Sequence, residues 1–233
     1  MTRRALALLA ALAMPLAAAP AAAQDWNAEV ERTAQGFRVG NPEAELQIVE
    51  FNSYTCPSCA RFERESEAEL RYFYIHEGHA SLEIRHFVRN IVDVAAALTA
   101  ECGETEDFFA NHRQLLMRQD EWLEQAQAVS PQQQARWNGG GIPERLRAVA
   151  NDLDFHELME ARGLSRSDLD RCLSDQARAE ALVDASTANA QEFGVQGTPS
   201  FVLNGTLLDD VHGWQPLRAV LVAARQSPAT TSE

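Results

Sequence analysis

The chain has 233 residues, a formal net charge of −14 at pH 7 and four cysteines. An acidic surface repels phosphate backbones, so this charge argues against a nucleic-acid-binding function. The length suits one large domain or a domain with an insertion. Four cysteines are too few to hold such a chain together by disulfides, so ordinary hydrophobic burial must supply the core.

The N-terminal segment predicts export. Two arginines precede a short apolar run over residues 5–12, which is too short to span a bilayer, and alanines at 21–23 suit signal peptidase. We expect residues 1–23 to be a signal peptide cut after Ala23, and the mature protein to be periplasmic. An uncleaved membrane anchor is the alternative, disfavoured by the alanines and prolines that follow the apolar run.

The next segment predicts a strand, a helix and a second strand. Residues 46–51 form a β-rich, mostly apolar run typical of a buried strand, after a short edge strand at 37–39. A helix is expected from Cys56 to about residue 77, and a second strand over 82–88. Strand, helix and strand at this spacing predict a βαβ unit with a parallel strand pair.

Residues 90–193 carry helical signals almost throughout. After them, strands are expected at 200–203 and 206–208, because Asn204-Gly205 is a strong two-residue hairpin signal. A last helix is expected over 214–224, followed by a disordered tail at 227–233.

This order of elements predicts an α/β fold. Residues 24–89 and 194–226 are expected to form the two halves of one domain, a mixed sheet with helices on both faces. Residues 90–193 are then an all-helical insertion between the halves.

Two cysteines open the first long helix, in the sequence Cys56-Pro57-Ser58-Cys59. Proline is favoured at the first helical position, which makes Cys56 the N-cap, where free backbone N–H groups and the helix dipole favour a thiolate. Cys59 lies one turn on, within disulfide range. We therefore expect a redox pair in which Cys56 is the exposed, attacking sulfur and Cys59 the shielded, resolving one.

A second motif, Gly197-Thr198-Pro199, lies directly before a predicted strand. Proline is tolerated at a strand start because it cannot donate to the ladder. If the Thr198-Pro199 bond is cis, the backbone turns sharply and can face the cysteine pair.

The sequences VEFNSYTCPSC and GVQGTPSFVLNG, with the helical segment between them, resemble the DsbA-type thiol:disulfide oxidoreductases of the thioredoxin superfamily. The resemblance runs from residue 36 to residue 224. It implies a thioredoxin fold with an inserted helical domain, Cys56 and Cys59 as the catalytic pair, and Pro199 as a cis-proline beside them. It implies no cofactor. Its implied partners are reduced exported proteins and a membrane redox partner for reoxidation.

Glu50, six residues before Cys56, matches the buried acid that this family places near the resolving cysteine, where it would help proton transfer. The alternative is a solvated strand residue. Its apolar neighbours Val49 and Phe51 favour the buried position.

The dipeptide between the cysteines departs from the most oxidising members of the family, which carry histidine there. Ser58 has no charge with which to stabilise a thiolate, so a milder potential is expected. Thr198 before the proline also occurs in isomerase and reductase relatives. The predicted function is therefore disulfide introduction into exported proteins, with isomerase or reductase chemistry as the alternative.

Cys102 and Cys172 lie in the helical segment. They are either two buried thiols or, as in some family members, a structural disulfide. A bond closing about seventy residues would stabilise the fold by roughly 4 kcal/mol in the chain-entropy model.

A metal site is the remaining alternative for Cys56 and Cys59. Structural zinc needs four ligands, and no second pair of nearby cysteines exists; His76 and His79 are expected to be solvated at a helix end. Copper binding through the reduced thiols stays open, because soft thiolates suit Cu(I). The run Glu63, Glu65, Glu67 and Glu69 is expected to be a solvated helix face.

Overall fold

The computed structural model describes residues 24–226. The predicted signal peptide (1–23) and disordered tail (227–233) lie outside the described residues. The strands are β1 (Val30–Arg32), β2 (Phe37–Gly40), β3 (Leu46–Asn52), β4 (Ala80–His86), β5 (Ser200–Leu203) and β6 (Thr206–Leu207). The α-helices are α1 (Pro57–Glu69), α2 (Ile91–Ala100), α3 (Phe108–Met117), α4 (Gln119–Gln127), α5 (Pro131–Asn138), α6 (Ile142–Asp152), α7 (Phe155–Glu160), α8 (Arg166–Leu173), α9 (Gln176–Phe193) and α10 (Trp214–Gln226).

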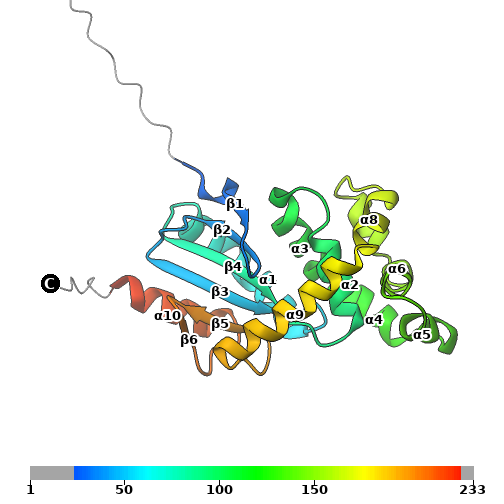
Figure 1. Ribbon diagram of the computed structural model, residues 1–233. Coiled ribbons are helices and arrows are strands. Elements are labelled where there is room, and N and C mark those ends of the chain that lie inside the picture. Colours follow the sequence, from blue (N-terminus) through cyan, green and yellow to red (C-terminus); the bar gives the residue numbers. More distant parts are fainter. Residues whose placement is uncertain (1–23, 227–233) are drawn as a thin grey trace, which may run out of the picture.

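The strands form one mixed sheet in the order β1-β2-β4-β3-β5-β6 (Figure 1). Strands β3 and β4 are parallel, as the βαβ prediction requires, and the other neighbours are antiparallel. Strand β4 begins and ends two residues earlier than expected. Strand β1 was not predicted, because its sequence Val-Glu-Arg has only one apolar residue and it lies at the sheet edge.

Helices cover both faces of the sheet. On one face, Phe62 of α1 packs on Phe201 of β5 and on Trp214 of α10, with ring centroids 4.7 and 6.3 Å apart. On the same face, Phe108 of α3 stacks on Phe37 of β2 at 3.8 Å. Helix α9 covers the other face, where its last residue, Phe193, packs against Phe51 of β3.

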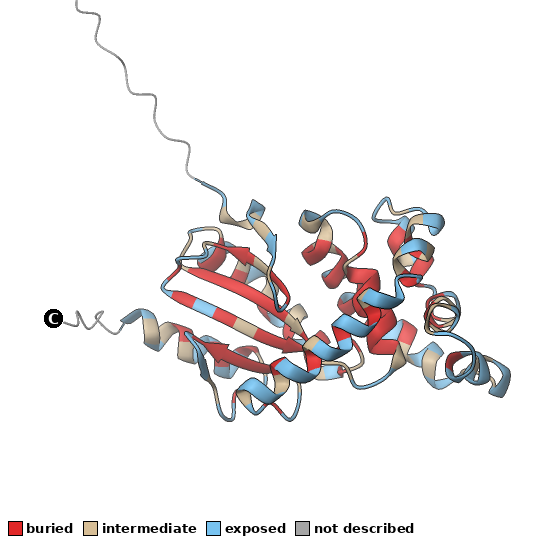
Figure 2. Cartoon of the chain, viewed as in Figure 1, coloured by how far each residue is buried: buried red, intermediate tan, exposed pale blue. Residues whose placement is uncertain are grey.

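The helical segment forms a second body beside the sheet (Figure 1). Helix α9 runs from this body back to the sheet and contacts α2, α6 and β4. Buried residues are concentrated along the sheet and along the centre of α2, whereas α5 and the outer turns of α9 are mostly exposed (Figure 2). The boundaries expected for the insertion, residues 90 and 193, stay a prediction.

The helix expected over 56–77 is divided into two parts. The α-helical part ends at Glu69, and a π-helical segment, η2 (Leu70–Ile75), continues it. The chain then turns at Gly78, whose φ of +74° favours glycine. The hydrogen-bond pattern changes from α-helical to π-helical in this segment. Its side chains Leu70, Tyr74 and Ile75 are buried, whereas Tyr72 and Phe73 are exposed.

Within residues 24–226, no helix is both long enough and apolar enough to cross a lipid bilayer.

Candidate active site

The N-terminus of α1 places the first cysteine. Cys56 is the N-cap, with extended backbone angles (φ −99°, ψ 113°), and Pro57 occupies the first helical position. The Cys56 carbonyl accepts the first helical hydrogen bonds, from the N–H groups of Cys59 and Ala60 at 3.1 and 3.3 Å. The sulfur of Cys56 therefore lies where the free N–H groups of the helix converge.

The Cys56 thiol is strongly acidified. Its hydrogen bond with the Cys59 thiol is the largest cause, and the backbone N–H groups of Cys59 and Ser58 act in the same direction. Together these contacts outweigh desolvation and lower the pKa of Cys56 to about 5. The thiol is therefore a thiolate at neutral pH, the form that performs disulfide exchange.

The Cys59 thiol, in contrast, resists ionisation. Burial raises the pKa of the Cys59 thiol well above its usual value, and the hydrogen bond to Cys56 and the charge of Glu50 act in the same direction. Both cysteines are free thiols. Cys56 is less exposed than the sequence suggested: it retains 6% of its surface and Cys59 retains none, because the loop before β5 packs over the pair.

That loop contains the predicted proline motif. The Thr198-Pro199 peptide bond is cis, and the Cys56 thiol donates a hydrogen bond to the Thr198 carbonyl at 3.1 Å. The Pro199 carbonyl accepts a hydrogen bond from Nδ1 of His212 at 2.9 Å. The structure thus brings the two cysteines together with Thr198 and Pro199. His212, which lies beyond this loop in the sequence, holds the loop through its hydrogen bond to the Pro199 carbonyl.

Glu50 lies buried on β3, with 1% of its surface exposed. It is not a solvated strand residue. Neither of its carboxylate oxygens has a hydrogen-bond partner among the described residues. Desolvation, followed by the charges of Glu63 and Cys56, raises the pKa of Glu50 well above its usual value. The carboxyl therefore holds a proton at a pH where an exposed glutamate is ionised.

The loop before Cys56 is held by a buried carboxylate on α2. Asp93 accepts hydrogen bonds from the Ser53 hydroxyl (2.8 Å), from the N–H and hydroxyl of Thr55 (2.9 and 3.0 Å), and from the Arg89 N–H (2.9 Å). Sequence reasoning missed Asp93. The available signal was local: Asn90 caps α2 through the N–H groups of Val92 and Asp93, so Asp93 lies at the N3 position of a capping motif.

Two further residues near the site were missed. Gln119 at the start of α4 is fully buried and donates hydrogen bonds to backbone carbonyls of the same loop. His112 of α3 lies 2.9 Å, through Nδ1, from the Tyr54 hydroxyl, and burial lowers the pKa of His112 to about 3. The hydrogen-bond partners that tie Gln119 and His112 to this loop lie more than fifty residues away in the sequence, so no local pattern indicates these two roles.

The acidic run on α1 is not the solvated face that the sequence suggested. Glu65 is exposed, but Glu63, Glu67 and Glu69 are half-buried. Glu63 lies one turn beyond Cys59, and desolvation raises the pKa of Glu63 to about 7. Alternate residues of a helix point in different directions, which is why the run does not share one environment.

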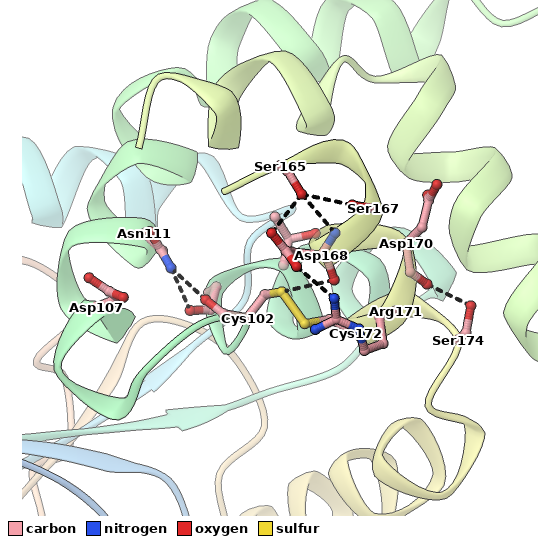
Figure 3. The surroundings of a disulfide bond; sticks show 12 residues. Cys102, Asp107, Asn111, Ser165, Ser167, Asp168, Asp170, Arg171, Cys172 and Ser174 are labelled. Carbon is pink, nitrogen blue, oxygen red and sulfur yellow. Dashed lines mark hydrogen bonds and ion pairs between the residues drawn. A yellow bond between two sulfur atoms is a disulfide. The ribbon is translucent and has the colours of Figure 1, made fainter. Parts of the chain in front are cut away.

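Cys102 and Cys172 are joined in a disulfide (Figure 3). Of the two alternatives that the sequence left open, the structural disulfide is therefore confirmed. The bond ties the end of α2 to α8 across a sequence separation of 70 residues. Asn111 donates to the Cys102 carbonyl at 3.0 Å, which anchors α3 to the same point. This pair therefore belongs to the architecture and lies apart from the free thiols.

The described residues contain no group of three or more His, Cys, Asp or Glu side chains arranged to hold a metal ion. His76 is half-exposed and pairs with Asp25 at 2.9 Å.

Comparison with known proteins places this site in a family. The thioredoxin family model matches residues 32–223, which include the Cys56–Cys59 pair and the cis-proline loop. The chain belongs to the thioredoxin family. A protein of known structure from Novosphingobium aromaticivorans, named a protein-disulfide isomerase, is 39% identical over 82% of this chain and 97% of its own, with a TM-score of 0.78.

The DsbA-type resemblance is confirmed for the fold. The structure of α-DsbA1 from Wolbachia pipientis matches 80% of this chain and 89% of its own, with a TM-score of 0.61 and 19% identity. BdbD from Bacillus subtilis matches 87% of this chain and 99% of its own, with a TM-score of 0.59 and 17% identity. The thioredoxin fold with inserted helices is therefore common to these proteins.

Curated relatives share part of their length with this chain. A Rickettsia conorii protein, named as a candidate protein-disulfide oxidoreductase, is 27% identical over 80% of this chain. This match covers 62% of the Rickettsia protein, so the chain spans about three fifths of the length of that relative.

Proposed function

We propose that the protein is a periplasmic thiol:disulfide oxidoreductase that introduces disulfides into exported proteins. The observation that carries the proposal is the contrast between two thiols one turn apart, with the pKa of Cys56 lowered to about 5 and the pKa of Cys59 raised. A thiolate stabilised in the folded protein favours the reduced form, which makes the disulfide form an oxidant.

The reaction follows from this contrast. A client thiolate attacks Sγ of Cys56 in the Cys56–Cys59 disulfide, the bond between the two sulfurs breaks, and Cys59 leaves with the electron pair. A second client thiolate then attacks the client sulfur of the mixed disulfide, and Cys56 leaves as a thiolate. The client has gained a disulfide and the protein has gained two electrons. The low pKa of Cys56 makes it the good leaving group of the second step.

Glu50 supplies a proton in this scheme. Cys59 leaves as a thiolate in a buried position, where its raised pKa favours the thiol. The pKa of Glu50 is raised by burial, so the carboxyl is protonated when Cys59 needs a proton. Thr198 and Pro199 hold the backbone against Cys56, so that the entering sulfur meets a fixed surface.

Export and reoxidation complete the proposal. The basic and apolar start of the sequence supports secretion with cleavage after Ala23. Reoxidation by a membrane partner follows from the DsbA-type resemblance. The reduced protein would pass its two electrons to that partner and return to the disulfide form.

The test is the redox equilibrium of the mature protein against glutathione buffers, read by alkylation and mass spectrometry. A Cys102→Ala/Cys172→Ala variant isolates the Cys56–Cys59 pair. A potential near the −120 mV typical of DsbA supports disulfide introduction, and one near the −270 mV typical of thioredoxin overturns it in favour of a reductase. Stoichiometric copper in the reduced protein without exchange activity would instead indicate a metal-binding role.

Isomerase activity is a second candidate, because the relative of known structure at 39% identity is named a protein-disulfide isomerase. An isomerase must re-form native bonds in a client that already carries wrong disulfides. Recovery of activity from a scrambled, fully oxidised client therefore distinguishes this function from oxidation of a reduced client. An isomerase restores activity to the scrambled client and also oxidises the reduced client, whereas an oxidase acts on the reduced client alone.

A further inference from the structure

Gln119 connects the inserted helices to the segment that carries Cys56. It is the first residue of α4 and is fully buried. Its Nε2 donates to the Tyr54 carbonyl at 2.6 Å and to the Cys56 carbonyl at 3.0 Å. The two donors of one side-chain amide thus bridge carbonyls that lie on either side of Thr55.

The Cys56 carbonyl is the first acceptor of α1. It accepts hydrogen bonds from the backbone N–H groups of Cys59 and Ala60 and from the side-chain amide of Gln119. Fixing this carbonyl fixes the backbone angles of the N-cap, and those angles decide where Sγ of Cys56 lies relative to the helix N–H groups. A group that orients the carbonyl therefore orients the sulfur without touching it.

The neighbouring residues are held separately. Asp93 binds the Ser53 hydroxyl and both donors of Thr55, so α2 holds the donors of this loop while α4 holds its acceptors. Tyr54 is fixed at its other end by His112 of α3. Three helices of the inserted segment thus converge on residues 53–56. Of the three side chains that they contribute, Asp93, His112 and Gln119, the last donates to the backbone of a reactive cysteine.

The Gln119 amide also changes the electrostatic environment of the Cys56 sulfur. Each N–H that points at the Tyr54 or Cys56 carbonyl places a partial positive charge beside an oxygen that would otherwise repel a nearby thiolate. Both hydrogen bonds lie in a buried region, where such charges are weakly screened. The amide therefore favours the ionised sulfur as well as its position.

We propose that Gln119 is a positioning residue for disulfide exchange, whose side-chain amide holds the Tyr54 and Cys56 carbonyls and so sets the reactivity of Cys56 from the inserted helices. This inference rests on the proposed function of the Cys56–Cys59 pair. It assigns the insertion a role in tuning the chemistry of the pair.

The test compares Gln119→Met with wild type. Methionine keeps the unbranched length of the side chain and removes both donors. The readout is the ionisation of Cys56, followed by thiolate absorbance at 240 nm across pH, together with the glutathione equilibrium. We expect the thiolate-to-thiol ratio at a fixed pH below neutrality to fall about tenfold, one unit of pKa, with a matching shift toward the oxidised form. Gln125→Met, on the same helix with its amide on Asp154 instead, is the matched control and should titrate as wild type.

A merely structural role would lower thermal stability and leave both readouts unchanged, and that result would overturn the inference. If Gln119→Met does not fold, the wild-type protein supplies the answer. The side-chain amide resonances of Gln119, followed by NMR through the titration of Cys56, should shift with the same midpoint; resonances that do not respond would overturn the inference. An ordinary thiol pKa for Cys56 in wild type would instead defeat the proposed function, so the two failures are distinguishable.

Discussion

Cys56 combines near-complete burial with a sulfur that ionises easily. The reduced protein should show a rise in thiolate absorbance at 240 nm with a midpoint near pH 5, because the pKa of Cys56 is lowered to about 5. The Cys59→Ala variant should titrate at higher pH, since the Cys59 hydrogen bond is the largest cause of the shift. A Cys56→Ala variant should show no transition below pH 8, because the pKa of Cys59 is raised. A low-pH transition that survives Cys56→Ala would contradict this assignment.

Glu63 is a source of pH-dependent instability. Its pKa is raised to about 7 in the folded protein, above its ordinary value of 4.5, so its contribution to stability is fully present below pH 4.5 and is lost as pH rises through 7. Glu63→Gln should therefore increase the free energy of unfolding at pH 8 by about 1–3 kcal/mol and change little at pH 4.

Denaturant unfolding at both pH values measures this effect. Glu65→Gln is the matched control, because Glu65 lies on the same helix and is exposed. Equal effects of the two substitutions at pH 8 would show that burial of Glu63 is not the cause.

At the scale of elements, α2 holds the catalytic loop through one carboxylate. Asp93→Asn replaces one acceptor oxygen with an amide that faces donors of Ser53, Thr55 or Arg89. Leaving buried donors without acceptors should lower the free energy of unfolding by about 2–3 kcal/mol. Denaturant unfolding measures the loss, and Asp184→Asn, at an exposed position on α9, is the control. Equal stability of the two variants would refute the role given to Asp93.

The disulfide that joins the turn after α2 to α8 stabilises the fold by constraining the unfolded chain. Because the bond spans 70 residues, the double variant Cys102→Ala/Cys172→Ala should lose about 4 kcal/mol of unfolding free energy. The glutathione equilibrium of Cys56 and Cys59 should remain as in wild type. An altered equilibrium would mean that the disulfide also acts on the reactive pair.

Elements with strong local signals could be predicted from the sequence, and those fixed by distant contacts could not. The apolar run of β3 and the Asn204-Gly205 turn between β5 and β6 are local, and both occur as expected. Strand β1 is polar and exists through pairing with β2, and the π-helical change after Glu69 depends on which residues α1 buries.

The same distinction applies to the site. Cys56, Cys59 and Pro199 are indicated by spacing and by the chemistry of their residue types. Gln119 and Asp93 are polar residues on helices, and their function follows from contacts with a loop far away in sequence. The capping position of Asp93 marks the start of α2 but does not indicate its contact with that loop. Hydrogen bonds of this kind leave no periodicity to detect.

For the whole molecule, the redox state should change how stability depends on pH. In the reduced protein, the pKa of Cys56 is depressed to about 5, below its unfolded value near 9, so its contribution is fully present above pH 9 and is lost as pH falls through 5. The oxidised protein lacks this titrating group. The stability of the reduced form relative to the oxidised form should therefore be about 2–3 kcal/mol greater at pH 7 than at pH 4.

Denaturant unfolding of both redox forms at the two pH values checks this expectation. The Cys56→Ser variant, which cannot form the thiolate, should follow the pH dependence of the oxidised wild-type protein. A reduced and an oxidised protein with parallel pH dependence would contradict a depressed pKa in the folded state.

The edges of the sheet bear on how the protein behaves among incompletely folded chains. The outer strands β1 and β6 contain three and two residues, and the longer strands β3 and β4 lie inside. A long free edge would invite an extended chain to add a strand by backbone hydrogen bonds, which is the first step of aggregation. With edges this short, a chain can approach the reactive sulfur and leave again without being recruited into the sheet. The architecture thus favours brief encounters over strand addition, as the proposed function requires.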